Sequence, residues 1–334
     1  MTSKLSFKWE SELLFLRVHF IVISLLLFSS CATLKNPQLQ AQLDNDNCNQ
    51  NKAYDYKASE LPRPIHEIEI DTVLASHFSS KSLNIGNAIG VLPILEEYLT
   101  KKKDFIQFPS IEKRLELIEL KERINSEINL ASLEISAVAS EIDCEEEKTD
   151  QIVTFIRSKA DNMESNLTVT SIAVGATAGI VAGSLELSGK EGKGLTLIGI
   201  STGVIEGVLG LVIIFNEKKM YVQHARNILK DVWEGPETSR YFPSSVWYYL
   251  NYYNPVGQHV SLRKQIVNQW LAFPVIAELN EKKREVLIGT YFGQGGVYTS
   301  DQLKIRTNMY DQLESSIKVM KQELKDLLLE FETL

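Results

Sequence analysis

Apolar residues recur at alternating steps of four and three residues in the central part of the chain. The stretch from Ile111 to Val174 contains neither glycine nor proline, so it holds no strong helix breaker. Steps of four and three place the apolar residues on one helix face, in the pattern of a coiled-coil seam. A second apolar stripe predicts that the helix packs against more than one neighbour. The seam consists of Ile124, Ile128, Ala131, Ile135, Val138 and Ile142, and the second stripe of Leu130, Leu133 and Ala137.

Glycine recurs at every fourth position in the two apolar segments that follow. Residues four apart share a helix face, so each glycine series forms a smooth groove along its helix. Glycine costs a helix interior about 1 kcal/mol relative to alanine, and close packing of two helices is a compensation for that cost. A polar turn, Ser188 to Gly194, separates the two segments. The pattern predicts a hydrophobic helical hairpin over residues 167–216, packed through Gly175, Gly179 and Gly183 against Gly199, Gly203 and Gly207.

Weaker patterns lie on both sides of these central segments. Before them, the alternating residues from Ile65 to Thr72 indicate a strand or extended chain, and Asn84 to Lys103 is predicted to be helical. After them, helices are predicted for Asn216 to Glu234, for Ser261 to Leu279 and from Ser300 onwards, with Gly235-Pro236 as a stop and a loop from Tyr291 to Tyr298. The last helix carries an apolar stripe of Met309, Leu313, Ile317, Met320, Leu324, Leu327 and Phe331.

The first thirty residues have the order of a targeting segment. Lys4, Lys8 and Arg17 precede an apolar run from Val18 to Phe28, which is short for a membrane span. Residues 31–60 are rich in Asn, Gln and Asp, and this composition indicates a polar tether.

The apolar run ends in Phe28-Ser29-Ser30-Cys31, which resembles the lipobox of bacterial lipoproteins. That resemblance implies cleavage before Cys31 and lipidation of its thiol, although Phe28 stands where the family usually has Leu. A plain secretory signal or an uncleaved anchor are the alternatives. The resemblance implies a membrane-anchored protein of the cell envelope, with the outer membrane favoured over the inner.

The sequence therefore predicts an all-α fold, in which long coiled-coil-like helices flank a glycine-rich hydrophobic hairpin. The expected divisions are a signal peptide (1–30), the tether (31–60), a short helical or extended segment (61–110), the long heptad helix (111–166), the hairpin (167–216) and a C-terminal helical region (217–334).

Charge and composition exclude some functions. The formal net charge is −8 and no basic stripe is visible, which argues against a general nucleic-acid binder. No zinc-protease helix, paired CxxC or phosphate-binding loop is present, so neither a metal nor a cofactor is expected.

Two cysteines remain after the proposed cleavage: Cys48 lies in the polar tether and Cys144 in the long helix. Export would permit a disulfide, but their settings favour two free thiols.

Three features have a chemical interpretation beside a structural one. Gly199-Ile-Ser-Thr-Gly203 matches a hydrolase nucleophile motif, but its glycines belong to the ladder, so Ser201 is expected to pack in a helix and no catalytic residue is predicted. Glu206 is the one carboxylate of the second apolar segment. It is a functional candidate if the hairpin enters a bilayer, and it faces solvent or a cation if it does not. Carboxylates four residues apart in the acidic run from Glu141 to Glu147 could share a hard cation, but the run is interpreted as a solvated helix face and no metal site is predicted.

The favoured function is a lipid-anchored structural or interaction protein of the bacterial envelope, without catalysis. Its expected partners are membrane lipid, through Cys31 and in the alternative below through the hairpin, and a protein or a second copy, through the helices. Glycine-zipper segments behind a lipobox also resemble small envelope lipoproteins of the surface-antigen type. The alternative is a membrane-inserting protein, because a hydrophobic hairpin between long amphipathic helices resembles α-helical pore-forming toxins and secretion translocators. An enzyme has no supporting site in this sequence.

Overall fold

The computed structural model of the chain describes residues 48, 53–187, 218–224, 226–255, 257 and 260–334. These residues are predominantly helical, and their strands form one two-stranded sheet, which confirms the all-α prediction. The elements are η1 (Ala58–Glu60), η2 (Ile65–Glu67), α3 (Thr72–His77), α4 (Ser80–Ala88), α5 (Leu92–Gln107), α6 (Ile111–Leu187), β1 (Lys219–Gln223), α8 (Ile228–Glu234), α9 (Ser244–Asn251), α10 (Leu262–Leu271), α11 (Pro274–Ala277), α12 (Glu281–Phe292), β2 (Gly295–Thr299) and α13 (Ser300–Glu332).

The chain divides into two compact units. The larger unit contains residues 37–150, 223–296 and 304–334, and the smaller contains residues 1–36, 151–222 and 297–303. Helix α6 begins in the larger unit, where the hydroxyl of Ser110 accepts a hydrogen bond from the backbone N–H of Lys113 at 3.2 Å. This cap satisfies one of the free N–H groups at the helix start, as the sequence predicts.

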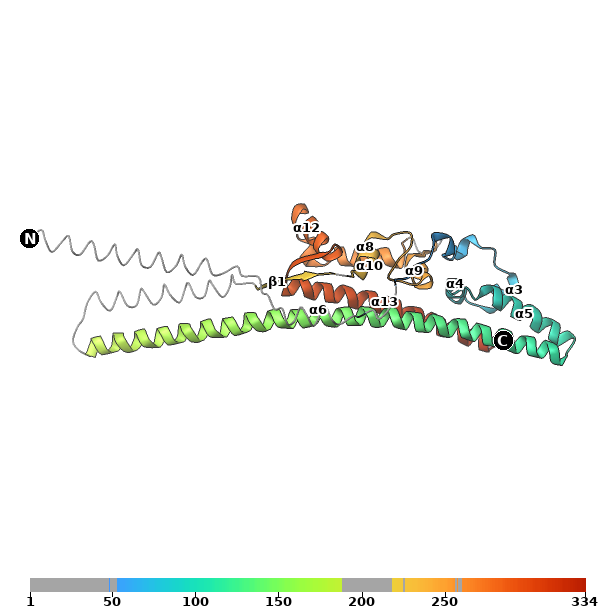
Figure 1. Ribbon diagram of the computed structural model, residues 1–334, viewed down its shortest axis with the longest axis horizontal. Helices are drawn as coiled ribbons and strands as arrows, with labels where there is room; N and C mark the ends of the chain where they lie inside the picture. The colour runs from blue at the N-terminus through green and yellow to red at the C-terminus, as the bar shows by residue number, and fades with distance from the viewer. Residues whose placement is uncertain (1–47, 49–52, 188–217, 225, 256, 258–259) are drawn as a thin grey trace, which may run out of the picture. The chain divides into compact units, whose positions relative to one another are not determined.

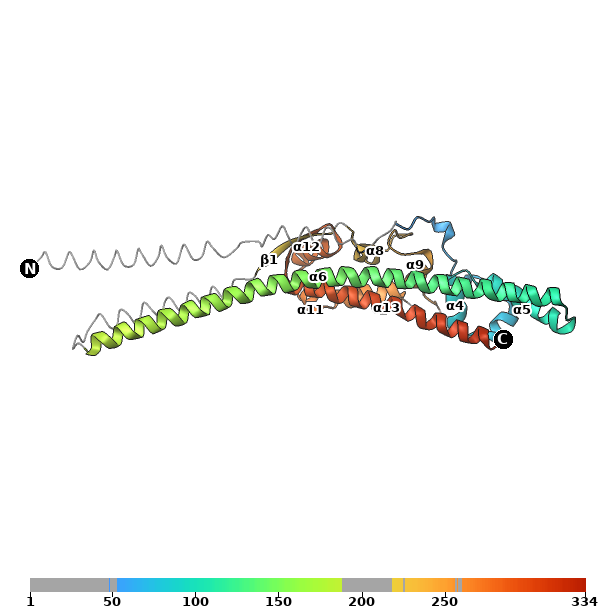
Figure 2. The same cartoon turned by 60° about the horizontal axis from the view of Figure 1, so that its bottom comes forward.

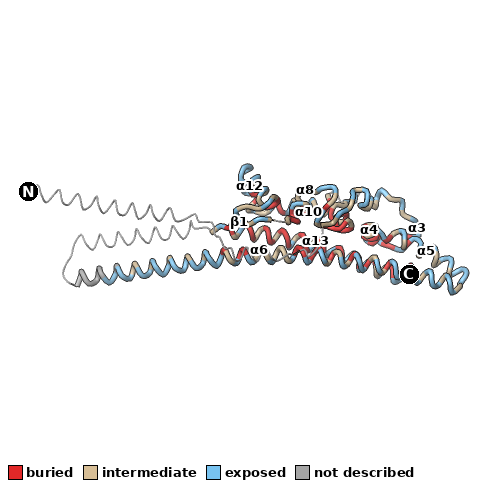
Figure 3. Tube along the Cα trace, in the orientation of Figure 1, coloured by how far each residue is buried: buried red, intermediate tan, exposed pale blue. Residues whose placement is uncertain are grey.

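The larger unit is organised around the pairing of α6 with α13. Lys121 on α6 lies 2.9 Å from Glu332, and Asp150 lies 3.2 Å from Lys304, so the two helices run antiparallel (Figures 1 and 2). Every residue of the α6 seam is buried, and so is every residue of the α13 stripe. Figure 3 shows the two rows of buried positions along these helices. The predicted apolar faces are therefore confirmed as the core.

The second stripe of α6 is not covered by the described residues. The side of α6 that carries it is opposite the seam, and Leu130 and Leu133 remain 54% and 67% exposed. The long helix does meet further neighbours, since Lys113 pairs with Asp104 on α5 and Glu134 accepts a hydrogen bond from Ser245 on α9. Those contacts are polar and lie at other positions. Packing of the second stripe against a neighbour is thus wrong for the larger unit.

The smaller unit contains the C-terminal half of α6 and most of the two strands. Ile152, Val153 and Ile156 are buried, as are Met220 on β1 and Tyr298 on β2. From Arg157 to Ile180, none of the residues whose burial is described is buried. Val169, Ile172 and Ile180 are each more than 60% exposed.

The sequence prediction is wrong at three places, each for a local reason. The expected helix from Asn84 to Lys103 is two helices, α4 and α5, because Gly90 has a φ of 73° and Pro93 occupies the first turn of α5. Of the two alternatives for Ile65 to Thr72, the structure has extended chain, which follows a short 3-10 turn. The helix expected from Ser261 to Leu279 stops at Leu271, and Pro274 opens α11.

The third error concerns the sheet. Residues Asn216 to Glu234 were predicted as one helix because Met220, His224, Ile228 and Val232 have helical spacing. The described part instead forms β1 and then α8, and the predicted loop at Tyr291 to Tyr298 contains most of β2. Pairing with β2 satisfies the backbone of Lys219–Gln223, a segment with the alternation that suits a strand. The stop at Gly235 is confirmed, since this residue ends α8 with a φ of 65°.

Candidate functional site

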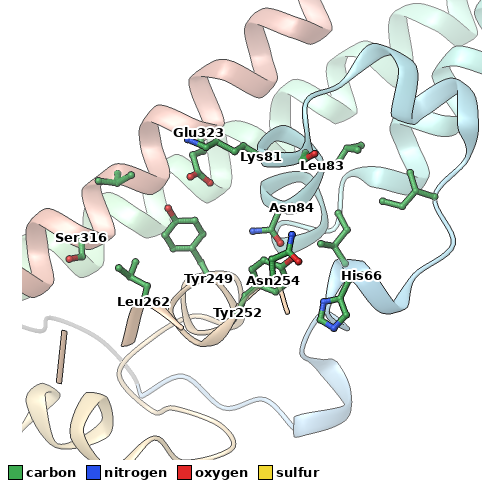
Figure 4. A pocket seen from close by; sticks show the side chains of 14 residues that line it. His66, Lys81, Leu83, Asn84, Tyr249, Tyr252, Asn254, Leu262, Ser316 and Glu323 are labelled. Atoms are coloured by element: carbon green, nitrogen blue, oxygen red, sulfur yellow. The ribbon is translucent and has the colours of Figure 1, made fainter. Parts of the chain in front are cut away.

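A pocket of about 570 Å³ lies in the larger unit, between α4, α9, α10, α13 and the segment at Ile65 to Ile70. Figure 4 shows the side chains that line it. Ligand sites usually have volumes of about 300–1,000 Å³ and an apolar wall with a few placed polar groups. Both properties are present here, so this pocket is the first candidate for a binding site.

The polar wall of the pocket is built around Glu323 of α13. The hydroxyl of Tyr249 donates a hydrogen bond to its carboxylate, and Lys81 of α4 lies near enough to interact with the same group. Burial raises the pKa of Glu323, while the Tyr249 hydrogen bond and the Lys81 charge lower it. Burial, followed by the Glu323 charge, raises the pKa of Tyr249. The wall thus places an anion, a hydroxyl and an ammonium close together.

Asn84 is fixed at the centre of the pocket by Tyr248. The Tyr248 hydroxyl donates to Oδ1 of Asn84 at 3.0 Å, and it accepts from Nδ2 of Asn87 at 3.1 Å and from the backbone N–H of Ile65 at 3.2 Å. Tyr248 is buried, and that burial raises its pKa to about 12, so it remains a donor at neutral pH. These bonds hold the N-terminal segment, α4 and α9 in one arrangement.

The rest of the pocket is apolar or aromatic. Leu83, Leu262 and Val319 contribute aliphatic surface, and Tyr249 and Tyr252 contribute rings. A second pocket of about 370 Å³ shares His66 and Tyr252 with the first. The two pockets therefore lie next to each other, along the N-terminal segment and the end of α9.

A cluster of buried charges lies elsewhere in the larger unit, around Arg306 of α13. Its guanidinium donates to the carbonyl oxygen of Tyr291, to Oδ1 of Asn227 at 2.9 Å and to the hydroxyl of Tyr310 at 2.8 Å. Arg306 is 1% exposed, so its charge is held by these oxygens and by Glu145 nearby. Burial, together with the Arg306 charge, lowers the pKa of His224 to about 2, and this histidine is neutral.

The acidic run on α6 is not the solvated face that the sequence predicts. Glu141 is 7% exposed and pairs with Nε of Arg226 at 2.5 Å, while Arg226 also stacks over the ring of Tyr241 at 4.4 Å. Burial raises the pKa of Glu145. Two other members of the run, Asp143 and Glu147, are exposed. The run therefore contributes both to the solvent face and to the core, where basic residues from after β1 meet it.

Glu146 and Asp311 form a carboxyl pair between α6 and α13. Burial and the neighbouring charge of Asp311 raise the pKa of Glu146 to about 7, and a hydrogen bond joins the two side chains. Asp143 and Glu314 add further negative charge around Glu146, and Lys318 lies 2.6 Å from Glu314. A proton shared by Glu146 and Asp311 accordingly links these two helices.

Cys48 and Cys144 form a disulfide across 96 residues of sequence. This corrects the expectation of two free thiols. The polar character of each local setting argued against pairing, but the chain returns from the tether to the middle of α6, where the Cα atoms are 5.5 Å apart. A few residues after Cys48, the N–H of Tyr54 donates a hydrogen bond to the carbonyl oxygen of Arg240 at 3.0 Å.

Most sequence-predicted site residues lie outside the described residues. These are Cys31, Gly199, Ser201, Gly203, Glu206 and Gly207. Gly175, Gly179 and Gly183 lie on the last part of α6, and among the described residues no atom comes within 4 Å of a Cβ added at Gly179. The hairpin packing thus remains a prediction. Within the described residues, no helix is long and apolar enough to cross a membrane, and no group of side chains fits a metal ion.

The pocket residues were missed because no local pattern marks them. Asn84, Tyr249 and Glu323 come from three distant parts of the sequence, and no motif includes any two of them. In comparisons with known proteins, no family model, no curated protein and no solved structure matches the chain.

Proposed function

We propose that this chain is a lipid-anchored protein of the bacterial envelope that acts by binding rather than by catalysis. The observation that carries the proposal is the disulfide between Cys48 and Cys144. Disulfides of this kind persist in oxidising compartments outside the cytoplasm. The disulfide therefore agrees with export by the basic and apolar segment that precedes Cys31.

The disulfide also shortens the tether that would join the lipid to the folded body. Cys48 follows Cys31 by 17 residues (48 − 31), so an extended chain of that length reaches at most about 60 Å. Without the bond, the free tether would continue towards the first helical turn at Ala58. The proposed anchor thus acts on the middle of α6, at Cys144, and holds the larger unit near the membrane surface.

The uncovered apolar side of α6 supports an interaction role. Leu115 and Leu133 point in the same direction from α6, since they are 18 residues or five helical turns apart, and Ile111, Ile118 and Leu130 lie at the edges of this side. All five are about half exposed or more. Separate surface leucines are ordinary, but aligned apolar positions rimmed by charges mark contact surfaces in many proteins. A protein partner, or a second copy of the chain, would bind through this side of the helix.

Mass spectrometry of the protein extracted from membranes tests the anchor. We expect an N-terminal peptide that begins at Cys31 and carries acyl mass. A matched variant has a plain secretory signal and Cys31→Ser, and it should appear in the aqueous phase of a detergent phase separation. An intact Met1, or a cleavage elsewhere without acyl mass, contradicts the proposal.

Membrane insertion by residues 167–216 is the alternative function. The observation in its favour is the exposed apolar surface of Val169, Ile172 and Ile180 on the last part of α6. The same Cys31→Ser variant separates the two functions. Release of dye from lipid vesicles by the unlipidated protein favours insertion, and a water-soluble protein that leaves vesicles intact favours the envelope interaction role.

A further inference from the structure

We propose that the pocket lined by Asn84, Tyr249 and Glu323 binds a neutral saccharide of at least two rings. This inference goes beyond the proposed envelope role, because it concerns a site that neither the anchor nor the helix surface uses. It rests on the charges, the hydrogen-bonding groups and the shape of the pocket.

The charges in the pocket favour a neutral ligand. Glu323 and Lys81 lie on the same wall and interact with each other, so their charges compensate. An anionic ligand that approached Lys81 would also approach the carboxylate, and a cationic ligand that approached Glu323 would also approach the ammonium. A charged ligand would lose its hydration on entering the pocket. The paired charges of Glu323 and Lys81 would offer it no net attraction to offset that cost.

The hydrogen-bonding groups favour a ligand with hydroxyl groups. The carboxylate of Glu323 only accepts, the ammonium of Lys81 only donates, and Asn84 offers a donating amide nitrogen beside its oxygen, which Tyr248 already occupies. Each sugar hydroxyl both donates and accepts, so neighbouring hydroxyls satisfy this alternating set. A purely apolar ligand would displace water from these groups and offer their remaining donors and acceptors no hydrogen bond, at a cost in affinity.

The aromatic and aliphatic surfaces match the remaining face of a sugar ring. The C–H face of a pyranose is apolar, and the rings of Tyr249 and Tyr252 with Leu262 and Val319 supply a complementary wall (Figure 4). The first pocket, at about 570 Å³, is larger than one sugar ring requires, and the second pocket lies next to it, with His66 and Tyr252 lining both. A disaccharide or a longer glycan therefore fits these pockets better than a monosaccharide.

The test uses the full mature protein in a detergent without a sugar headgroup. Saturation-transfer NMR and calorimetry would measure binding of N,N′-diacetylchitobiose and maltose, with glucosamine and glucuronate as charged comparators. We expect at least one of the neutral disaccharides to bind and both charged sugars to bind more weakly. Glu323→Ala should weaken that binding about tenfold or more, because it removes a charged hydrogen-bond acceptor from the ligand.

Two further variants keep the outcome interpretable. Lys81→Met changes an exposed side chain, so it should fold normally and still weaken binding several-fold. Glu285→Ala removes an exposed carboxylate on α12, away from the pocket, and should leave the affinity unchanged. The proposal is overturned if neither disaccharide binds at about 10 mM, if a charged sugar binds more tightly, or if Glu323→Ala and Lys81→Met both retain full affinity.

Discussion

The sulfur atoms of Cys48 and Cys144 join the polar segment after the proposed lipid site to the centre of the longest helix. The bond closes a loop of 96 residues, which contains α3, α4, α5 and the first part of α6. It therefore restricts the unfolded chain over almost a third of the sequence, and its contribution to stability should be large.

Removal of this disulfide should lower the free energy of unfolding. For Cys48→Ser with Cys144→Ser, the loop-entropy relation gives a loss of up to about 4.7 kcal/mol, and measured losses for native disulfides are about 2–5 kcal/mol. Denaturant unfolding of the double variant, compared with the oxidised protein, measures the change. Unchanged stability in the double variant would contradict the proposed structural role of the bond.

Replacement of Arg306 should destabilise the larger unit strongly. Arg306→Met removes the donor to the Asn227 Oδ1 and to the Tyr310 hydroxyl, while the Tyr291 carbonyl oxygen keeps the amide nitrogen of Asn227 at 3.0 Å. A buried polar group that loses its hydrogen-bond partner costs about 1–3 kcal/mol. The matched control is Arg157→Met, whose side chain is 51% exposed and should change stability by about 0.5 kcal/mol or less. Thermal unfolding of both variants distinguishes a buried hub from a surface charge.

The pair of Glu146 and Asp311 predicts that stability falls as pH rises. The pKa of Glu146 is about 7 in the folded protein and near 4.3 in the unfolded chain, so the folded state binds more protons between these values. The contribution of Glu146 to the free energy of unfolding is therefore fully present below about pH 4.3. It declines as the pH rises to about 7, and it is lost above pH 7. Glu146→Gln keeps a donor to Asp311 at every pH, and should flatten the decline.

The size of this effect is limited by solvent. Part of the Glu146 side chain is exposed, so screening reduces the contribution to the order of 1 kcal/mol at pH 8. Denaturant midpoints between pH 5 and pH 8 would measure it for the natural protein and for Glu146→Gln. Glu147→Gln, an exposed neighbour, is the control and should keep the natural pH profile. Equal slopes for Glu146→Gln and the natural protein would exclude the shared proton.

The sequence predicted those parts of the fold that are determined by local periodicity. The seam from Ile124 to Ile142 and the stripe from Met309 to Phe331 are buried because a helix repeats every 3.6 residues whatever it packs against. Strand β1 was missed because Met220 and His224 have helical spacing by coincidence, and only pairing with β2 decides their conformation. Strand preference depends on such neighbours more than helix preference does.

The candidate pocket and the disulfide required three-dimensional information. Glu323 is 239 residues from Asn84 in sequence (323 − 84), and nothing near either residue indicates that they line one cavity. Cys48 and Cys144 likewise lie in segments of unrelated composition. Glu141 looked like part of a solvated run because Arg226, its partner, follows 85 residues later. Residues whose role depends on a distant partner have no periodic signal along the chain.

Gly179→Leu decides whether the glycine ladder of α6 packs against the second ladder. We expect the variant to be less stable, because a leucine side chain would enter a contact built for glycine, and overpacking costs about 1–3 kcal/mol. An increase in the stability of Gly179→Leu would be equally informative. Among the described residues no atom lies within 4 Å of a Cβ at this position, and a truly open helix surface would gain up to about 1 kcal/mol from losing glycine. Ser201→Ala, which adds no volume, should change stability little and serves as the control. A higher melting temperature for Gly179→Leu would refute the packed hairpin, and loss of a hydrolase activity in Ser201→Ala would replace it with a catalytic serine.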